Sequence, residues 1–464
     1  MISAVQPIDA ELLRKFDVSG PRYTSYPTAD RFVETFGVEA YGQALVQRRT
    51  GTAAMALPLS LYVHIPFCES LCYYCACNKI ITKHHDRAAP YLRYLSREVD
   101  LHTAVIGQGQ PVSQVHLGGG SPTFLSDLEL RELMDMLRRN FSFSPDGEYS
   151  VEVDPRTIDA SRLDVLADLG FNRLSFGVQD FDPAVQKAVH RIQPVEQVFG
   201  LVAAARARGF GSINVDLIYG LPQQTPESFD RTLAQVNELR PDRIALYAYA
   251  HLPERFKPQR RIVTADLPSG GEKVSMLARS LAAFMGAGYV YVGMDHFALP
   301  DDALAVAKQQ GRLHRNFQGY STQPDCDLIA LGVSSIGRIG ASYSQNAKTM
   351  EEYCDLLDQG RFPVVKGLAL SHDDILRRAV IMAIMCQGEL QYEAIESAYL
   401  VDFKTYFANE LKSLAGLREQ GLVTFDDNGI TVTAHGWFFV RAVAMVFDLH
   451  LQTDRTRARF SKII

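Results

Sequence analysis

The sequence lacks a long apolar run and lacks an excess of charge of one sign. Its 464 residues include 47 Lys and Arg against 53 Asp and Glu, a formal net charge of −6. No apolar run reaches the roughly 18 residues that a membrane-spanning helix needs, so we expect no membrane association. The mildly acidic balance argues against nucleic acid as a partner. Residues 1–17 contain acidic side chains and no apolar leader segment, which predicts a cytoplasmic protein.

Cysteine is scarce and unevenly placed. The chain has 7 cysteines, an odd number, and four of them fall within residues 68–77. Such clustering is typical of metal or cluster ligation in a reducing compartment and argues against a disulfide framework.

Residues 61–250 alternate between short apolar segments and helical segments. Strands are predicted at 61–67, 114–120, 149–155, 173–179, 212–220 and 243–250, with intervening helices such as 127–141 and 195–209. Strand–helix repeats predict a parallel sheet with right-handed crossovers. Six units are too few for a closed eight-stranded barrel, so the expected fold is α/β with an open, partial (βα)6 barrel.

The regions outside the barrel differ from it in composition. We predict an N-terminal arm and linker at 1–60, the barrel at 61–300, an extension with connecting elements at 301–370, and a cap at 371–464. The last region is mainly helical and ends in two short strands around a DDNG turn, which is winged-helix-like. It has 12 acidic and 10 basic residues, whereas a DNA-binding wing would be basic. No exposed apolar repeat indicates an oligomer, so we expect a monomer.

Polar residues gather where the predicted strands end. In a barrel of parallel strands these ends form the face that carries the active site. The polar residues are Cys68, Gly118–Gly120, Glu152, Asp154, Gln179, Asp216, Tyr249 and His251.

The cysteines have the spacing C-x3-C-x2-C at Cys68, Cys72 and Cys75. Three thiolates can hold three corners of a cubane iron–sulfur cluster, which usually takes four, and would leave one iron open. A zinc site is the alternative, but the usual paired spacing is missing. Cys77 is too close to Cys75 for easy ligation of the same cube, and its role stays open.

The pattern C-x3-C-x-aromatic-C, followed by GGGSP at 118–122, resembles the radical S-adenosylmethionine superfamily. Glycines there would let the backbone approach a ligand closely. The segments HIPFC, LCYYCACNK, PRYTSYPTA, VEVDPR, FGVQDF, NVDLIYGLPQQT, YAHLPERF, GMDHFA and HRNFQGYST together resemble the oxygen-independent coproporphyrinogen III oxidases.

This resemblance implies a reaction and its cofactors. The family carries one [4Fe-4S] cluster and two S-adenosylmethionine molecules. It converts two propionate groups of coproporphyrinogen III to vinyl groups through a 5′-deoxyadenosyl radical, giving protoporphyrinogen IX. An electron donor and an electron acceptor are implied as further partners, and the sequence identifies neither.

The resemblance also implies roles for particular residues, none of them a catalytic acid or base. Cys68, Cys72 and Cys75 would ligate the cluster. The first S-adenosylmethionine would contact Tyr62, Gly119, Glu152 and Ile336. The second would contact Tyr74, Gly120, Ser121, Gln179, Arg191, Asp216 and Ala250.

Several of these side chains need partners on physical grounds. Asp216 lies between two apolar residues and should point into the barrel, where a carboxylate needs a ligand or a cation. Arg191 is predicted either to be that cation or to hold another carboxylate. The four carboxylates of the substrate require Arg or amide donors, for which Arg22 is the first candidate, with His251 and Arg315 as further ones. Tyr23 and Tyr26 could stack on the macrocycle or simply pack.

Two other functions remain alternatives. A haem-binding chaperone would keep the cysteine motif but lack Cys77 and the PRYTSYP arm, and would carry an H-N-x-x-Y-W-like motif. Here Cys77 and the arm are present, and the corresponding loop reads HRNFQGYST. A radical methylase would leave the match of the arm and the cap unexplained.

Overall fold

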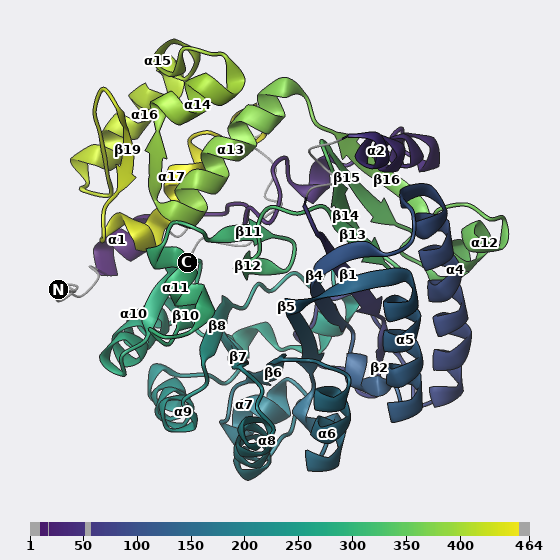
Figure 1. The fold of residues 1–464 in the computed structure, drawn as a ribbon. Helices are drawn as coiled ribbons and strands as arrows, with labels where there is room; N and C mark the ends of the chain where they lie inside the picture. Colours follow the sequence, from purple (N-terminus) through teal and green to yellow (C-terminus); the bar gives the residue numbers. More distant parts are fainter. Residues whose placement is uncertain (1–9, 17, 52–56, 454–464) are drawn as a thin grey trace.

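The computed structural model describes residues 10–16, 18–51 and 57–453 (Figure 1). Residues 1–9, which carry part of the argument against a leader segment, lie outside the described residues, as do 52–56 of the predicted linker and 454–464 of the predicted cap. Within the described part of the chain, no helix combines the length and apolarity that crossing a membrane requires.

One twelve-stranded sheet forms the frame of the molecule. Its parallel part has the order β13 (Leu328–Leu331), β1 (Leu59–Ile65), β4 (Gln110–Gly119), β5 (Phe141–Val153), β6 (Arg173–Gln179), β7 (Ser212–Tyr219) and β8 (Arg243–Ala248). Antiparallel strands extend both edges: β14 (Ile336–Ile339), β15 (Ser342–Asn346) and β16 (Val364–Ala369) beyond β13, and β10 (His296–Ala298) and β9 (Val290–Gly293) beyond β8.

Helices cover the outer side of the curved sheet (Figure 1). They are α4 (Ala88–Ile106), α5 (Asp127–Asn140), α6 (Ala160–Asp168), α7 (Pro183–Ala188), α8 (Val195–Ala207), α9 (Pro226–Leu239) and α10 (Gly270–Gly286). Their sequences explain their limits and faces. Helix α5 begins at a capping box of Ser126 and Glu129, and it buries a stripe that includes Leu130, Leu133 and Leu137.

The prediction of a partial barrel is confirmed, and the structure adds strands at both edges. Strand β6 has the predicted bounds, 173–179, and four of the other predicted strands lie within four residues of theirs. Strand β5 begins eight residues earlier than predicted, at Phe141. Strand β13 joins the barrel beside β1, which the sequence did not indicate. With only four buried residues, LIAL, it is too short to show a period.

Paired charges fill the barrel at the amino ends of its strands. Glu148 pairs with Arg173, and Arg243 Nε lies 2.7 Å from Asp302 Oδ1. Gln114 Nε2 donates to Glu148 Oε1 at 3.1 Å. Buried charges are tolerated when they are paired in this way, so this layer closes one end of the barrel and leaves the carboxyl ends of the strands for the site.

The C-terminal region is mainly helical, as predicted. Its helices are α13 (His372–Gln387), α14 (Tyr392–Tyr399), α15 (Phe403–Tyr406), α16 (Ala408–Glu419), α17 (Val440–Met445) and α18 (Leu449–Thr453). Strands β18 (Val423–Phe425) and β19 (Gly429–Val432) form the predicted hairpin, and β17 (Glu389–Gln391) pairs with β19. This helices-plus-wing arrangement lies beside the barrel, next to α11 and β11 (Figure 1).

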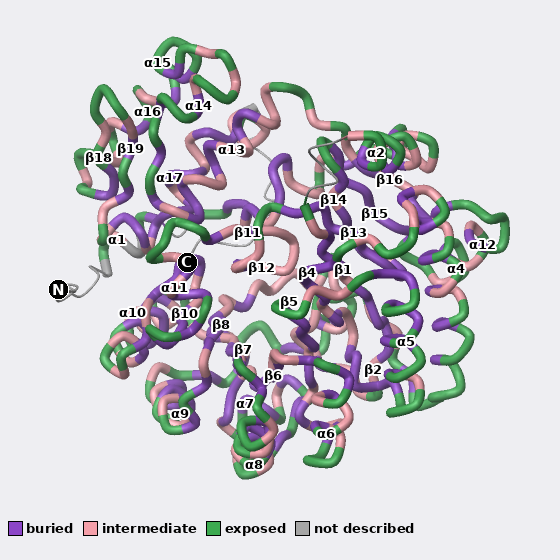
Figure 2. The backbone as a smooth tube through the Cα atoms, viewed as in Figure 1, coloured by how far each residue is buried: buried purple, intermediate pink, exposed green. Residues whose placement is uncertain are grey.

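The N-terminal arm runs between the barrel and the C-terminal region. After α1 (Ala10–Lys15), the chain passes through a buried stretch to α2 (Val38–Thr50) (Figures 1 and 2). Tyr23 and Tyr26 are fully buried, and the Tyr23 hydroxyl donates to Asp448 Oδ2 at 2.9 Å. Stacking of these rings on a macrocycle is therefore the wrong interpretation, since both pack between the arm and the C-terminal region.

The remaining elements are short. Strands β2 (Phe67–Cys68) and β3 (Ile80–Ile81) flank the cysteine loop, and β11 (His314–Asn316) pairs with β12 (Gly319–Ser321). Helices α11 (Ala303–Gln309) and α12 (Met350–Asp358) connect strands of the two sheet edges. Both pairs of short strands lie next to the site described below.

Candidate cofactor and substrate site

The three predicted ligand cysteines lie in the loop that follows β1. Cys68, Cys72 and Cys75 line one cavity of about 310 Å³, here named the cysteine cavity. The glycine stretch after β4 fixes this loop, because the amide of Gly120 donates to the carbonyl of Ile65 at 2.7 Å. The loop is therefore held at the carboxyl ends of the two central strands.

The thiols fit a cluster better than a single ion. Among the described residues, no three His, Cys, Asp or Glu side chains converge closely enough to hold one metal ion. A cubane binds each thiolate at a different iron, so what it needs is three thiols around one shared space. The cysteine cavity provides that arrangement.

Cys77 lies where the cysteine cavity meets a second cavity, and it lines both. A hydrogen bond from its thiol is the main reason that the pKa of Cys75 falls to about 6, an effect that outweighs burial. The fourth thiol is thus next to the predicted ligands and at the boundary of two spaces.

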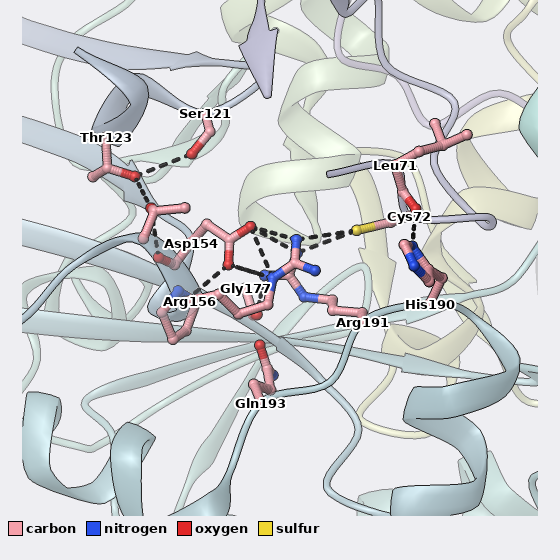
Figure 3. A network of polar contacts seen from close by, with 12 residues as sticks. Leu71, Cys72, Ser121, Thr123, Asp154, Arg156, Gly177, His190, Arg191 and Gln193 are labelled. Atoms are coloured by element: carbon pink, nitrogen blue, oxygen red, sulfur yellow. Dashed lines mark hydrogen bonds and ion pairs between the residues drawn. The ribbon is translucent and has the colours of Figure 1, made fainter. Parts of the chain in front are cut away.

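A network of charges surrounds Cys72 (Figure 3). Arg156 Nη2 donates to Cys72 Sγ at 3.4 Å, and Arg191 Nη1 does so at 3.5 Å. Both guanidinium groups also pair with Asp154, at 2.7 Å from Arg156 and 3.2 Å from Arg191. They place positive charge beside a sulfur that would carry negative charge as a ligand.

The same network decides between the two alternatives for Arg191. Burial raises the pKa of Asp154, but the guanidinium groups of Arg191 and Arg156 outweigh it and hold that pKa below its usual range. Arg191 also donates to the carbonyl of Gly177 at 2.6 Å. Of the two alternatives, the structure favours the second: Arg191 pairs with another carboxylate, Asp154, and forms no ion pair with Asp216 among the described residues.

The second cavity, of about 470 Å³, is here named the arm cavity because Arg22 and Thr24 of the arm line it. All four residues expected at the first S-adenosylmethionine also line it: Tyr62, Gly119, Glu152 and Ile336. They come from three different strands and the start of a fourth, and the sheet order brings them together.

Gly119 occupies a position that only glycine fits. Its φ is +116°, and a Cβ would lie 2.7 Å from Nδ1 of His64. Its amide donates to Glu152 Oε2 at 3.3 Å, and the ring of His116 lies 3.3 Å from the other oxygen. Glu152 is thus held at the rim, with lone pairs left for a ligand.

Six of the seven residues expected at the second S-adenosylmethionine line the cysteine cavity: Tyr74, Gly120, Ser121, Gln179, Arg191 and Asp216. Ala250 does not line it. Its carbonyl accepts from Gln259 Nε2 at 3.2 Å, and the same Gln259 nitrogen donates to the carbonyl of Tyr74 at 3.0 Å. Position 120 requires glycine, because a Cβ there would lie 2.7 Å from the backbone of Pro66.

Asp216 points into the barrel, as predicted, and its partners are neutral. Ser175 Oγ donates to Asp216 Oδ2 at 3.0 Å, and Asn214 Nδ2 donates to Oδ1 at 2.9 Å. Burial and the nearby charge of Glu152 raise the pKa of Asp216 from 3.8 to about 6. This carboxyl group is therefore available to a ligand that donates hydrogen bonds or carries positive charge.

The three candidates for binding substrate carboxylates do not all lie in one place. Arg22 and Arg315 both line the arm cavity. His251 lines neither cavity, and its ring nitrogen Nδ1 lies 2.9 Å from the Tyr249 hydroxyl.

Other residues of the site were not assigned from the sequence. Asp154 and Arg156 lie in the segment VEVDPR, and Phe317 and Gln318, which line the arm cavity, lie in HRNFQGYST. Both segments carried the family resemblance, so that resemblance was the available signal. His116 alternates along β4 with buried apolar residues, which marked it as inward-facing.

Comparison with known proteins agrees with this geometry. The sequence profile of the Radical SAM superfamily matches residues 62–236, and that of the HemN C-terminal domain matches residues 370–439. The solved structure described as coproporphyrinogen III oxidase (HemN) from Escherichia coli, a radical SAM enzyme, has a TM-score of 0.90 and 48% identity, covering 96% of this chain and all of the other. The fold is thus that of a radical S-adenosylmethionine enzyme.

Curated relatives identify the family within this superfamily. The oxygen-independent coproporphyrinogen III oxidase of Pseudomonas aeruginosa is 51% identical over 98% of both chains. That of Escherichia coli is 49% identical over 99% of this chain and 100% of its own. The chain therefore belongs to the family of oxygen-independent coproporphyrinogen III oxidases.

Proposed function

We propose that the protein converts two propionate groups of coproporphyrinogen III to vinyl groups without oxygen, giving protoporphyrinogen IX in haem biosynthesis. The single observation that carries this proposal is the pair of adjoining cavities, one lined by three cysteines and the other by arginines of the arm and of β11. Relatives named for this activity span the whole chain.

The proposed cofactors are one [4Fe-4S] cluster and two S-adenosylmethionine molecules. Cys68, Cys72 and Cys75 would hold the cluster, with Arg156 and Arg191 beside Cys72. When bound, the cluster and S-adenosylmethionine supply a 5′-deoxyadenosyl radical that abstracts hydrogen from a propionate side chain.

The two groups of residues expected around S-adenosylmethionine remain our assignment. Tyr62, Gly119, Glu152 and Ile336 would bind the first molecule. Glu152 offers carboxylate oxygens at the rim of the arm cavity. The second molecule would lie against Tyr74, Gly120, Ser121, Gln179, Arg191, Asp216 and Ala250.

Asp216 suits the second molecule because its carboxyl is inside the barrel and lacks a cation among the described residues. A sulfonium or ammonium group would lower the cost of its negative charge. Gln179 reaches the same cavity because a bulge at the end of β6 turns its backbone, with a φ of +68°.

We further propose a cytoplasmic monomer with two unidentified redox partners: a donor that would reduce the cluster, and an acceptor that would take the electron left on the substrate radical. Clustered reduced cysteines support a reducing compartment. Residues 371–464 would act as a cap that closes the arm over the barrel.

Anaerobic turnover tests the reaction. The protein with its cluster reconstituted is mixed with coproporphyrinogen III, S-adenosylmethionine and a reductant, and the products are oxidised and separated as porphyrins. Protoporphyrin that depends on S-adenosylmethionine is the expected result. Release of 5′-deoxyadenosine without protoporphyrin would keep the radical site and refute the substrate, and tight haem binding in that case would favour the chaperone.

Counting bound S-adenosylmethionine tests the cofactor number. Two labelled molecules are expected for each chain with a cluster, and Asp216→Ala should reduce the number to one. A single molecule in the unaltered protein would contradict the assignment.

A further inference from the structure

We propose that Arg22 and Arg315 form a carboxylate-binding site in the arm cavity that recognises one propionate group of the substrate. The inference rests on the proposed function for the identity of the substrate, and on the structure for the site. It assigns a specificity role to two arginines from opposite parts of the chain.

Arg315 is a buried cation with an unused donor. Arg315 is only 4% exposed and lines the arm cavity. Its Nη1 has no hydrogen-bond partner among the described residues. Its Nε donates to the carbonyl of Arg22 at 3.1 Å, and its guanidinium group lies 4.6 Å from the ring centre of Tyr320. The stacked ring and the carbonyl fix the guanidinium group and leave one edge of the fork for an acceptor.

Arg22 brings a second cation to the same cavity. Its guanidinium group lies 5.2 Å from the ring centre of Tyr247, and no ion pair to it is present within the described chain. Because Arg315 holds the Arg22 backbone, the two side chains are coupled in position. Two arginines on one cavity wall match the planar oxygens of a carboxylate.

The surroundings do not neutralise this charge. The charges of Arg22 and Arg315 both act to lower the pKa of the Asp295 carboxyl, and the charge of Arg441 acts in the same direction. Arg441 donates to the carbonyl of Pro21 at 3.0 Å, so it anchors the arm. Arg22 and Arg315 are thus two guanidinium groups facing one carboxylate, which leaves an excess of positive charge.

The other charged and titratable groups on the cavity do not supply the missing anion. Glu152 lines the same cavity but lies beside His116 and forms no ion pair with either arginine among the described residues. His296 is neutral, since burial and the charge of Arg315 lower its pKa to about 3. An anionic ligand would therefore complete the pairing that buried cations require.

Binding of coproporphyrin III, the oxidised and unreactive tetracarboxylate, tests the site. Fluorescence titration is done anaerobically with the cluster-loaded protein, and coproporphyrin III tetramethyl ester serves as the neutral probe. Arg22→Gln and Arg315→Gln should each weaken tetracarboxylate binding by about 10- to 100-fold, and leave ester binding unchanged. Arg315→Lys should recover part of the loss, because it keeps the charge but not the fork.

A matched control and a second readout separate this role from a structural one. Arg97→Gln removes a side chain that pairs with Asp358 on the surface and should bind like the unaltered protein. Arg22 is only half-buried, so its replacement leaves the core intact. In turnover, Arg22→Gln should raise KM for coproporphyrinogen III far more than it lowers kcat.

The outcomes distinguish this inference from the proposed function. Equal binding of coproporphyrin III by both variants and the unaltered protein would overturn the carboxylate site alone. Arginine-dependent binding without turnover would support the site and refute the proposed reaction. Failure of the unaltered protein to bind coproporphyrin III would overturn both.

Discussion

The cysteine cavity and the arm cavity share a wall, formed by Cys77, Gly119, Glu152 and Tyr247, yet they are built differently. The cysteine cavity is lined by residues 68–218 together with Tyr247, so one continuous half of the barrel supplies nearly all of it. The arm cavity combines the arm, the central strands and residues 315–336. Local sequence motifs can specify the first cavity, whereas only the complete fold assembles the second.

The two cavities also differ in how their charged side chains are paired. Arg156 and Arg191 are paired with Asp154 before any ligand binds. Arg315 forms no ion pair among the described residues, although Arg191 Nε and Arg315 Nη1 alike have no hydrogen-bond partner there. This difference in ion pairing supports the proposal that the arm cavity binds an anion.

Loss of a ligand cysteine should have the largest effect. Cys68→Ser removes one of the three thiolates, so we expect no stable cluster and no turnover. Iron and sulfide content and visible absorbance measure the result. Cys354→Ser, a half-buried cysteine outside both cavities, should keep the full cluster; retention of full cluster content by Cys68→Ser would refute the ligand assignment.

Breaking the charge network around Asp154 should be the next largest effect. Arg191→Met leaves Asp154 with Arg156 alone, and breaking a buried ion pair costs about 3–5 kcal/mol of unfolding free energy. Urea unfolding measures it. Arg231→Gln breaks an exposed pair with Asp182 and should cost less than about 1 kcal/mol; equal losses would show that the cysteine cavity is not prepared by its ion pairs.

Asp216 should give stability a distinct pH dependence. Its pKa is raised by burial from 3.8 to about 6, so the folded state binds the proton more tightly than the unfolded state does. The contribution to stability is complete below pH 3.8 and is lost as the pH rises through about 6, a change of about 3 kcal/mol.

Asp216→Asn should remove this contribution and become relatively more stable above pH 6. Unfolding free energies of the variant and the unaltered protein, compared between pH 4 and pH 7, measure the difference (about three pH units, which span the shift). Asp230→Asn, at an exposed pair with Arg279, is the control. A parallel dependence for Asp216→Asn and the unaltered protein would contradict the buried placement of this carboxyl.

A substitution in the arm should have the smallest effect of the four on stability and turnover. Tyr23→Phe removes the hydroxyl that donates to Asp448 and should cost about 1 kcal/mol of stability. Because the arm carries Arg22 into the cavity, a modest rise in KM for the substrate should accompany it. An unchanged stability and KM would mean that the contact between arm and cap does not support the arm cavity.

Much of the barrel could be predicted from the sequence because each parallel strand carries its own apolar pattern. The segment RLSFGVQ alternates buried and half-buried residues over its full length, and the observed strand has the same bounds. The cysteine spacing likewise located the cluster loop, because loop ligands lie close along the chain.

Pairings between distant residues could not be read from the sequence. The sequence left open whether Arg191 pairs with Asp216 or with another carboxylate, and the bulge at the end of β6 and Gly177 place its guanidinium group on Asp154. A Cβ at Gly177 would lie 2.9 Å from Arg191 Nη2. Such choices depend on local backbone turns of a few ångströms, to which residue patterns are insensitive.

The most direct test of the two roles is an anaerobic structure of the cluster-loaded protein with coproporphyrin III and S-adenosylmethionine. We expect the cluster on Cys68, Cys72 and Cys75 and a propionate within hydrogen-bond distance of Arg315 Nη1. A macrocycle bound away from the arm cavity, with Arg315 still unpartnered, would contradict the account.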